Sequence, residues 1–406
     1  MIKLNAYSNS NNFVIKYITD KFNEIKKKIE ILSSKEKKYL KYIFPEMFVG
    51  DELNSIFFAD LLASNLFDFR KKYKSVNEYF EIVFFSSLDI KNICRDKNEE
   101  DSLCVRQEYF KNAWLSGSKL RKRILFDYQE QCVGIKDISK YICKNNKNFT
   151  AFQNYIFVNV IDMSRIRKDK LRYGILKKIF CYEKMVNAKD RVNIVKNLNI
   201  DVCPYCNRAY ISCFEDNWKV KKERSSADID HFYSKSKFVL FSLSLYNFVP
   251  CCKICNSIFK NDRNLDILYP YQDSYEKQVK FTLIDNKKIL AAKDVYGWNK
   301  GKEIGVINIM PKERSRNEQI EREIQLFRIR EVYQIHNEFA EKILYCKNVL
   351  GKSAKAEILE CINKDLKTDK LKMEEFNKFF YGVDIEGIEQ EIRKVPLAKL
   401  VHDILM

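Results

Sequence analysis

Two CxxC pairs constrain the folding of this chain more than any other feature of its sequence. The first pair is Cys203 and Cys206, and the second is Cys252 and Cys255. A CxxC turn lets both sulfurs reach one ion, and four thiolates arranged in a tetrahedron suit Zn²⁺. Because four protein ligands close the coordination shell, the pattern predicts a structural zinc site that draws the two pairs together.

Other interpretations of the pairs explain the sequence less well. A redox CxxC usually opens a helix after a strand in a βαβ unit, and no such pattern surrounds either pair. Two coincidental pairs of core cysteines would be the remaining explanation. Cys251 adjoins Cys252 and could compete for the ion, but it lacks the CxxC spacing with Cys255. Cys213 has no partner at ligand spacing.

The chain has 13 cysteines, an odd number, and we expect no disulfide framework. Those outside the module stand in apolar helical contexts, so we expect small core residues. They are Cys94, Cys104, Cys132, Cys143, Cys181, Cys346 and Cys361.

The hydrophobic pattern predicts an α+β protein that is mostly helical. Ile18, Phe22, Ile25 and Ile29 are spaced as on one helix face. Residues 57–73 and 316–350 read as further helices, and 276–300 as a β-hairpin with its turn at 285–288. At 406 residues we expect two or three domains. We divide the chain into a helical N-terminal domain of unknown role (1–195), the cysteine-rich module (196–275), and a C-terminal hairpin and helical region packing on it (276–406).

The charge balance favours a polyanionic partner. Lys and Arg outnumber Asp and Glu by 73 to 55, which gives a net charge of +18. Coding from AT-rich DNA would also enrich Lys. The basic stretches 116–123 and 164–172, the second with Arg165 and Arg167, either line a nucleic-acid path or are solvated helix faces.

No apolar stretch approaches the ~18 residues of a membrane-spanning helix, and the first residues contain no apolar signal segment. We therefore expect a cytoplasmic protein without a membrane partner.

The segment between the CxxC pairs contains the residues that phosphodiester hydrolysis requires. Asp230 stands beside His231, Asn247 follows, and Asn256 comes directly after the second CxxC. An imidazole can activate water near neutral pH. Carboxylate and amide oxygens are suitable ligands for Mg²⁺ or Mn²⁺. Asp228 reads as a solvent-facing neighbour of Asp230 or a residue supporting the site.

In the order and spacing of these residues, the module resembles the HNH family of nucleases, whose ββα-metal fold is also called the His-Me finger. The resemblance implies that His231 is the general base, that Asp230 and Asn256 hold the catalytic metal, and that Asn247 orients His231. It also implies that Lys260 contacts phosphate. Lys235 and Lys237, which follow the histidine, either bind phosphate as well or are ordinary loop charges. The third HNH position is Asn256 rather than histidine, which still supplies a metal ligand.

The segments "CPYCNR", "DIDHFYSKSKF", "NFVPCCKICN" and "LYPY" resemble bacterial antiphage HNH proteins of the Septu and retron-linked type. That resemblance implies an endonuclease effector that prefers DNA. No GxxxxGK[ST] motif occurs in the chain, so a partner ATPase or sensor subunit is expected. The alternatives are an RNA- or tRNA-cutting HNH effector, and a non-catalytic zinc-containing subunit that binds nucleic acid or acts as a scaffold.

Overall fold

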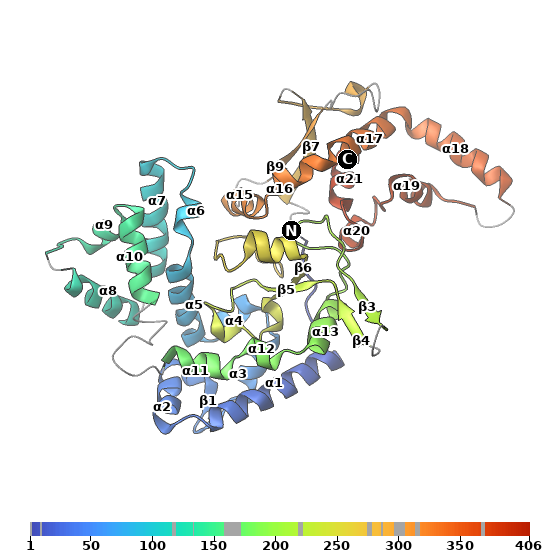
Figure 1. The fold of residues 1–406 in the computed structure, drawn as a ribbon. Coiled ribbons are helices and arrows are strands. Elements are labelled where there is room, and N and C mark those ends of the chain that lie inside the picture. Colours follow the sequence, from blue (N-terminus) through green and yellow to red (C-terminus); the bar gives the residue numbers. More distant parts are fainter. Residues whose placement is uncertain are drawn as a thin grey trace.

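The computed structural model describes residues 2–8, 10–115, 119–132, 134–157, 172–217, 222–273, 278–285, 287–295, 305–312, 317–366 and 370–406. Arg165 and Arg167 lie outside these ranges. The described chain is mostly helical and carries four small antiparallel sheets, as expected for an α+β protein (Figure 1).

Helices of the N-terminal half form two groups, each around its own apolar cluster. The first group comprises α1 (Asn12–Glu30), α2 (Ser34–Ile43), α3 (Ser55–Ala63), α4 (Leu66–Lys72), α11 (Arg172–Ile179), α12 (Tyr182–Met185) and α13 (Ala188–Leu198), with β1 (Phe48–Val49) and β2 (Glu52–Leu53). The second comprises α6 (Ile90–Ile93), α7 (Glu99–Phe110), α8 (Lys119–Gln131), α9 (Ile138–Cys143) and α10 (Asn146–Ile156). Helix α5 (Lys74–Ser87) contributes to both clusters, and Figure 1 shows α7 to α10 gathered at one side of the molecule.

Helix α1 shows why the predicted apolar stripe folds as it does. Asn11 accepts a hydrogen bond from the Phe13 N–H at the first turn, which satisfies one of the free donors there. Ile25 and Ile29 are buried as the spacing predicts. The same face also buries Lys21, whose ammonium group lies 3.0 Å from Asp190 of α13. This ion pair joins the two ends of the N-terminal half.

Apolar packing crosses the expected boundary at residue 195. The larger cluster contains side chains of α1 to α5, of α11 to α13, of the cysteine-rich module and of the C-terminal helices. The smaller cluster covers residues 82–156 and is built on Phe85, Trp114 and Phe152. The division into three domains stays a prediction, and the first group of helices shares its core with the module.

The module between the CxxC pairs consists of short strands and irregular turns. Strands β3 (Cys213–Asp216) and β4 (Lys222–Ser225) pair with each other, and so do β5 (Asp228–His231) and β6 (Phe248–Cys251). The π-helix η6 (Ile254–Lys260) follows β6. Between β5 and β6 the chain makes two single 3₁₀ turns, η4 (Val239–Phe241) and η5 (Leu245–Asn247).

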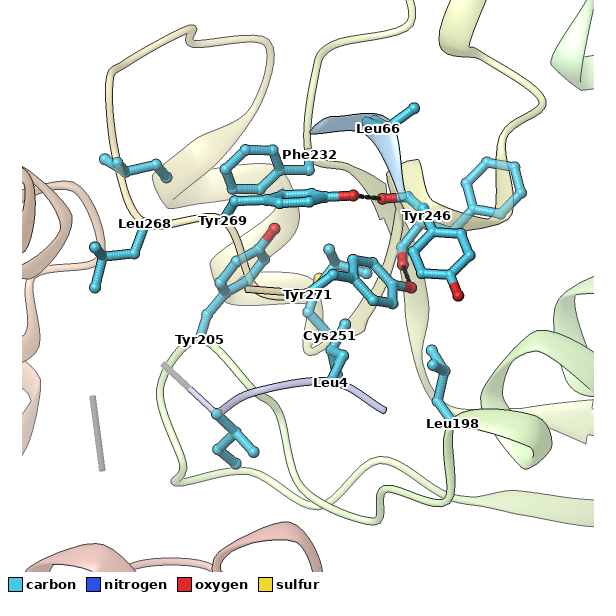
Figure 2. Packing of buried hydrophobic residues seen from close by; sticks show 14 of the residues in the cluster. Leu4, Leu66, Leu198, Tyr205, Phe232, Tyr246, Cys251, Leu268, Tyr269 and Tyr271 are labelled. Carbon is cyan, nitrogen blue, oxygen red and sulfur yellow. Dashed lines mark hydrogen bonds between the residues drawn. The ribbon is translucent and has the colours of Figure 1, made fainter. Parts of the chain in front are cut away.

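Tyrosines after η6 secure the back of the β5–β6 hairpin (Figure 2). The Tyr271 hydroxyl donates to the Phe248 carbonyl at 2.7 Å, and the Tyr269 hydroxyl donates to the Tyr246 carbonyl at 2.7 Å. The extended residues 2–8 run alongside, where the Leu4 N–H donates to the Pro270 carbonyl at 2.8 Å. These bonds satisfy carbonyl groups at the start of β6, in the turn before it and in the segment after η6.

The predicted C-terminal hairpin is confirmed, with one strand more than expected. Strand β7 (Val279–Asp285) pairs with β8 (Lys288–Ile289), and on its other edge with β9 (Val306–Pro311). The remaining elements are α15 (Asn317–Leu326), α16 (Ile329–Tyr333), η8 (Gln334–His336), α17 (Asn337–Val349), α18 (Lys352–Asp365), α19 (Met373–Tyr381), α20 (Ile388–Lys394) and α21 (Ala398–Leu405).

Two predicted helices are broken. The segment 316–350 is interrupted at Arg328, which adopts a left-handed backbone conformation with φ of 51°, so its apolar face is not continuous and Phe339 is exposed. Residues 57–73 form α3 and α4 instead of one helix, because Asn65 caps a new helix by accepting from the Phe67 N–H. Of the cysteines expected in the core, Cys104 and Cys361 are exposed.

Glu323 of α15 is fully buried, and burial raises the pKa of its carboxyl group to about 8. Among the described residues neither carboxylate oxygen has a hydrogen-bond partner that would offset the burial of a charge. The folded state therefore keeps a proton that the unfolded chain releases near pH 4.5. The stability of the fold consequently decreases as the pH rises from about 4.5 to about 8.

We predict that Glu323→Gln stabilises the protein by up to about 3 kcal/mol at pH 7. The buried carboxyl group must take up a proton from solution when the chain folds at this pH, and the neutral amide needs none. Urea denaturation at pH 5 and pH 8 measures this gain, which should be larger at pH 8. The exposed Glu338 on α17 provides the control Glu338→Gln. An equal gain at both pH values would contradict the assignment.

Candidate active site and metal centre

The β5–β6 hairpin sorts the predicted residues onto two faces. Asp230 pairs with Val249, and His231 pairs with Phe248. Because successive strand residues point to opposite sides, Asp228 and Asp230 share one face and His231 lies on the other. The carboxylates and the imidazole therefore reach their surroundings in different directions.

The four predicted cysteines come together. The sulfur atoms of Cys203, Cys206, Cys252 and Cys255 all lie within 4.8 Å of one another. Tetrahedral zinc with Zn–S bonds of ~2.3 Å needs sulfur separations of ~3.8 Å, so the cluster fits a structural metal ion such as zinc. Cys251 and Cys213 are not part of the cluster, as the spacing predicts.

The close approach of the four sulfur atoms has an electrostatic consequence. Burial raises the pKa of the Cys203 thiol. Hydrogen bonds from the other three thiols, Cys203 first, lower the pKa of Cys252. Four sulfurs this close can all be thiolates only if a cation compensates their charge, which is what a divalent metal provides.

His231 is buried, with 6% of its surface exposed. Its Nε2 atom lies 3.0 Å from the carbonyl oxygen of Ser242. Burial lowers the pKa of the imidazole to about 3, against a smaller opposing effect of the Ser242 carbonyl, so the ring is neutral at ordinary pH. Because a carbonyl oxygen only accepts hydrogen bonds, Nε2 carries the proton and Nδ1 keeps its lone pair.

Aromatic rings surround the imidazole. The Tyr182 ring meets His231 edge-on with centroids 4.5 Å apart, and the Phe248 ring does so at 5.1 Å. The ammonium group of Lys235 lies over the Tyr182 ring at 4.7 Å and bonds Glu183 at 2.5 Å. Helix α12 thus covers the His231 ring. Lys235, in the loop after β5, fixes this helix through its contacts with Tyr182 and Glu183.

Asn247 fixes the loop that carries His231 without touching the imidazole. Its side-chain oxygen accepts from the Tyr233 N–H at 2.8 Å, and its amide nitrogen donates to the carbonyls of Tyr233 and Phe241 at 2.9 and 3.1 Å. Phe241 precedes Ser242, the residue whose carbonyl accepts from His231. Asn247 therefore fixes two backbone segments next to His231, one at Tyr233 and one at Phe241.

Asp230 is buried, and both of its oxygens have partners. The Tyr205 hydroxyl donates to Oδ2 at 2.6 Å, and Lys260 Nζ donates to Oδ1 at 3.1 Å. Lys260 also donates to the His231 carbonyl at 2.8 Å. The ion pair is almost fully buried, with side-chain exposures of 1% for Lys260 and 4% for Asp230.

The side chain of Asn256 contacts Asp228. Its amide nitrogen donates to Asp228 Oδ2 at 3.1 Å, and both side chains are partly exposed. A carboxylate and an amide oxygen are the donor types that Mg²⁺ or Mn²⁺ prefers. The donor set therefore fits a hard cation at Asn256, with Asp228 as an additional candidate ligand beside Asp230.

The predicted phosphate-binding residues are engaged within the chain. Lys260 is buried in the ion pair with Asp230, and Lys235 bonds Glu183. Lys237 donates to the Asp262 carbonyl at 2.8 Å and lines a cavity of about 300 Å³ with residues of α5, α6 and α10. In the first basic stretch, Arg121 bonds Glu78 at 3.0 Å. Their contacts with nucleic acid stay predictions.

Comparison of the chain with models of protein families, with curated proteins and with solved structures gave no match in any of the three. Within the described ranges, no helix is long and apolar enough to cross a bilayer. The site must therefore be interpreted from its own geometry.

Sequence reasoning did not identify three residues that touch the candidate site, namely Tyr182, Tyr205 and Ser242. Tyr182 is distant in sequence from His231, and Ser242 acts through a backbone carbonyl that any residue would supply. Only Tyr205 stands inside a motif, between two cysteine ligands, but nothing in that position indicates that its hydroxyl reaches Asp230.

We predict that the purified protein holds about one zinc ion per chain and that Cys206→Ser loses it together with thermal stability. Because structural zinc contributes directly to folding free energy, one lost ligand should reduce stability as well as occupancy. Elemental analysis and a melting curve measure the two effects. The exposed Cys104 gives the control Cys104→Ser, which should keep both. Well-folded wild-type protein without zinc would rule out the assignment.

Proposed function

We propose that this chain is a metal-dependent endonuclease of the HNH type that hydrolyses phosphodiester bonds, with DNA as the preferred substrate. The observation that supports it most is the state of His231. A neutral imidazole whose Nε2 is bound to the Ser242 carbonyl keeps the Nδ1 lone pair, which is the group a general base needs.

In this mechanism the chain positions a base beside a phosphate. His231 Nδ1 accepts the proton of the attacking water, and the Ser242 carbonyl stabilises the imidazolium that forms, because it accepts from Nε2–H. A Mg²⁺ or Mn²⁺ ion held by Asn256 and a carboxylate of β5 would neutralise charge on the phosphate and the leaving oxygen. Because those carboxylates and His231 point to opposite faces of β5, this mechanism requires that substrate binding rearranges the end of the strand so that base and metal reach the same phosphate. Asn247 keeps the loop of the base in place.

Burial makes the imidazole a weak base in the free protein, because a pKa of about 3 disfavours the charged form. Two groups can restore basicity. The Glu183 carboxylate already favours the charged ring, and a bound phosphate would add negative charge nearby. For a substrate to bind productively, α12 should therefore move away from His231 and expose the imidazole.

The proposed biological role is that of an effector in a bacterial antiphage system, activated by a partner ATPase or sensor subunit. This part rests on the resemblance of the motif segments and on the absence of a P-loop motif in the chain. The net charge of +18 supports a nucleic-acid substrate but does not separate DNA from RNA. Incubation with plasmid DNA and with total RNA, with and without Mg²⁺ or Mn²⁺, makes that distinction.

One observation favours a second candidate, a non-catalytic zinc-containing subunit that binds nucleic acid or acts as a scaffold. His231 is nearly inaccessible, and Lys260 occupies one oxygen of the predicted metal ligand Asp230. A binding module would keep these groups as buried structural contacts. Cleavage in the presence of Mg²⁺ or Mn²⁺ excludes this alternative.

We predict that His231→Ala and Asn256→Ala both abolish cleavage but differ in their response to metal. Loss of the base lowers the rate by ~10²–10⁴, and added metal cannot supply a proton acceptor. Loss of a ligand weakens metal binding, so high Mg²⁺ or Mn²⁺ should restore part of the activity. Cleavage rates measured over a metal titration separate the two variants.

His402 pairs with Asp403 at the end of the chain, and His402→Ala is the matched control, expected to cleave like wild type. Wild-type cleavage by His231→Ala would exclude the proposed base. Loss of zinc from that variant would instead make His231 a structural ligand.

A further inference from the structure

Tyr205 joins two parts of the molecule that the proposed mechanism treats separately. It stands between Cys203 and Cys206, and 1% of its surface is exposed. Its ring stacks on Phe327 with centroids 4.3 Å apart and planes at 19°. The stack directs the hydroxyl to Asp230 Oδ2, at 2.6 Å. The side chain of Tyr205, which stands between two cysteine ligands, thus bonds a residue of β5, the strand that carries His231.

From Asp230 the hydrogen bonds continue to the backbone of His231. Lys260 Nζ donates to Asp230 Oδ1 at 3.1 Å and to the His231 carbonyl at 2.8 Å. The chain of contacts therefore runs from Tyr205 through Asp230 and Lys260 to the peptide group of His231. Every side chain in it is at least nine-tenths buried, so water cannot easily replace a lost partner.

A buried ion pair is favourable only when the remaining lone pairs of its carboxylate also find donors. Lys260 serves one oxygen of Asp230, and Tyr205 is the donor that serves the other. Without the hydroxyl, Asp230 Oδ2 would be buried without this bond, and the carboxylate would turn to find another donor. Lys260 would move with it, and the His231 carbonyl would lose the group that holds it.

We infer that Tyr205 is a positioning residue that couples the cysteine cluster to His231 through Asp230 and Lys260. The expected change in cleavage rate rests on the proposed function. The expected change in the position of His231 does not. Only 1% of the Tyr205 surface is exposed, so its hydroxyl is not available to a substrate and should affect the rate of the chemical step while leaving substrate binding unchanged. A displaced base lowers the rate by ~10–100-fold.

The test compares Tyr205→Phe with Tyr333→Phe. Both variants remove one hydroxyl from a residue that is 1% exposed and keep the ring. The Tyr333 hydroxyl contacts the same CxxC turn, because it donates to the Cys206 carbonyl at 2.8 Å, but it does not bond Asp230. Zinc content and melting temperature show whether either variant has lost its fold.

Nuclear magnetic resonance of ¹⁵N-labelled histidine gives a readout independent of cleavage. The chain has three histidines, His231, His336 and His402, so the ring signals can be assigned by substitution. Tyr205→Phe should shift the His231 ring signals and leave the other two in place, with zinc retained. Tyr333→Phe should leave the His231 and His402 signals unchanged; the His336 ring meets the Tyr333 ring edge-on at 5.9 Å, so its signals do not enter this comparison.

The kinetic expectation is a kcat about 10–100-fold lower for Tyr205→Phe with KM unchanged, and wild-type values for Tyr333→Phe. Unchanged His231 signals in Tyr205→Phe would overturn the inference. It would also be overturned if both variants lost the same fraction of kcat in proportion to a loss of zinc. If wild type does not cleave, the proposed function fails, while the His231 signals still decide the coupling. If Tyr205→Phe does not fold, Asp230→Asn breaks the same chain one contact further on and is judged by the same signals.

Discussion

Convergence of four sulfur atoms within 4.8 Å is the constraint on which the rest of the module depends. The two CxxC pairs are far apart in the chain, and the insert between them contains little regular structure of its own. Its short strands could not form a stable unit alone, because two-stranded hairpins are marginal in water. Surrounding segments add support, since residues 2–4 bond the backbone at Pro204 and Pro270, and Tyr333 bonds the Cys206 carbonyl.

The side chains of the candidate site are strongly buried. His231, Asp230, Asn247 and Lys260 are each 6% exposed or less. Burial keeps the imidazole neutral and its proton on Nε2, but it also lowers basicity and blocks access. The Tyr182 ring and the contact between Lys235 and Glu183 lie beside the imidazole and help to shield it from solvent. Under the proposed function, such a site would need a further event to expose the base.

The helical half of the chain is part of the same architecture. Helix α12 supplies Tyr182 and Glu183, and Ser242 donates its hydroxyl hydrogen bond to the Phe180 carbonyl between α11 and α12. The large apolar cluster extends from α1 to α21 through the module. Only residues 82–156 have a core of their own among the described residues, and that unit borders the cavity at Lys237.

Local patterns in the sequence were sufficient for the cysteine cluster, the α+β class, the first helix and the C-terminal hairpin. Each depends on contacts between near neighbours or on ligands whose spacing is diagnostic, such as Cys252 over Cys251. The break at Arg328, the position of Asn256 beside Asp228 and the burial of Lys260 were not predictable, because no local pattern encodes them. Tyr205 and Tyr182 reach the candidate site from remote segments. The sequence by itself determined which chemical groups are present and which cysteines can share an ion. Only the tertiary structure decided which of those groups meet. Strand alternation separates the Asp230 and His231 side chains, and long-range packing brings Tyr205 to Asp230 and places Lys260 between Asp230 and the His231 carbonyl.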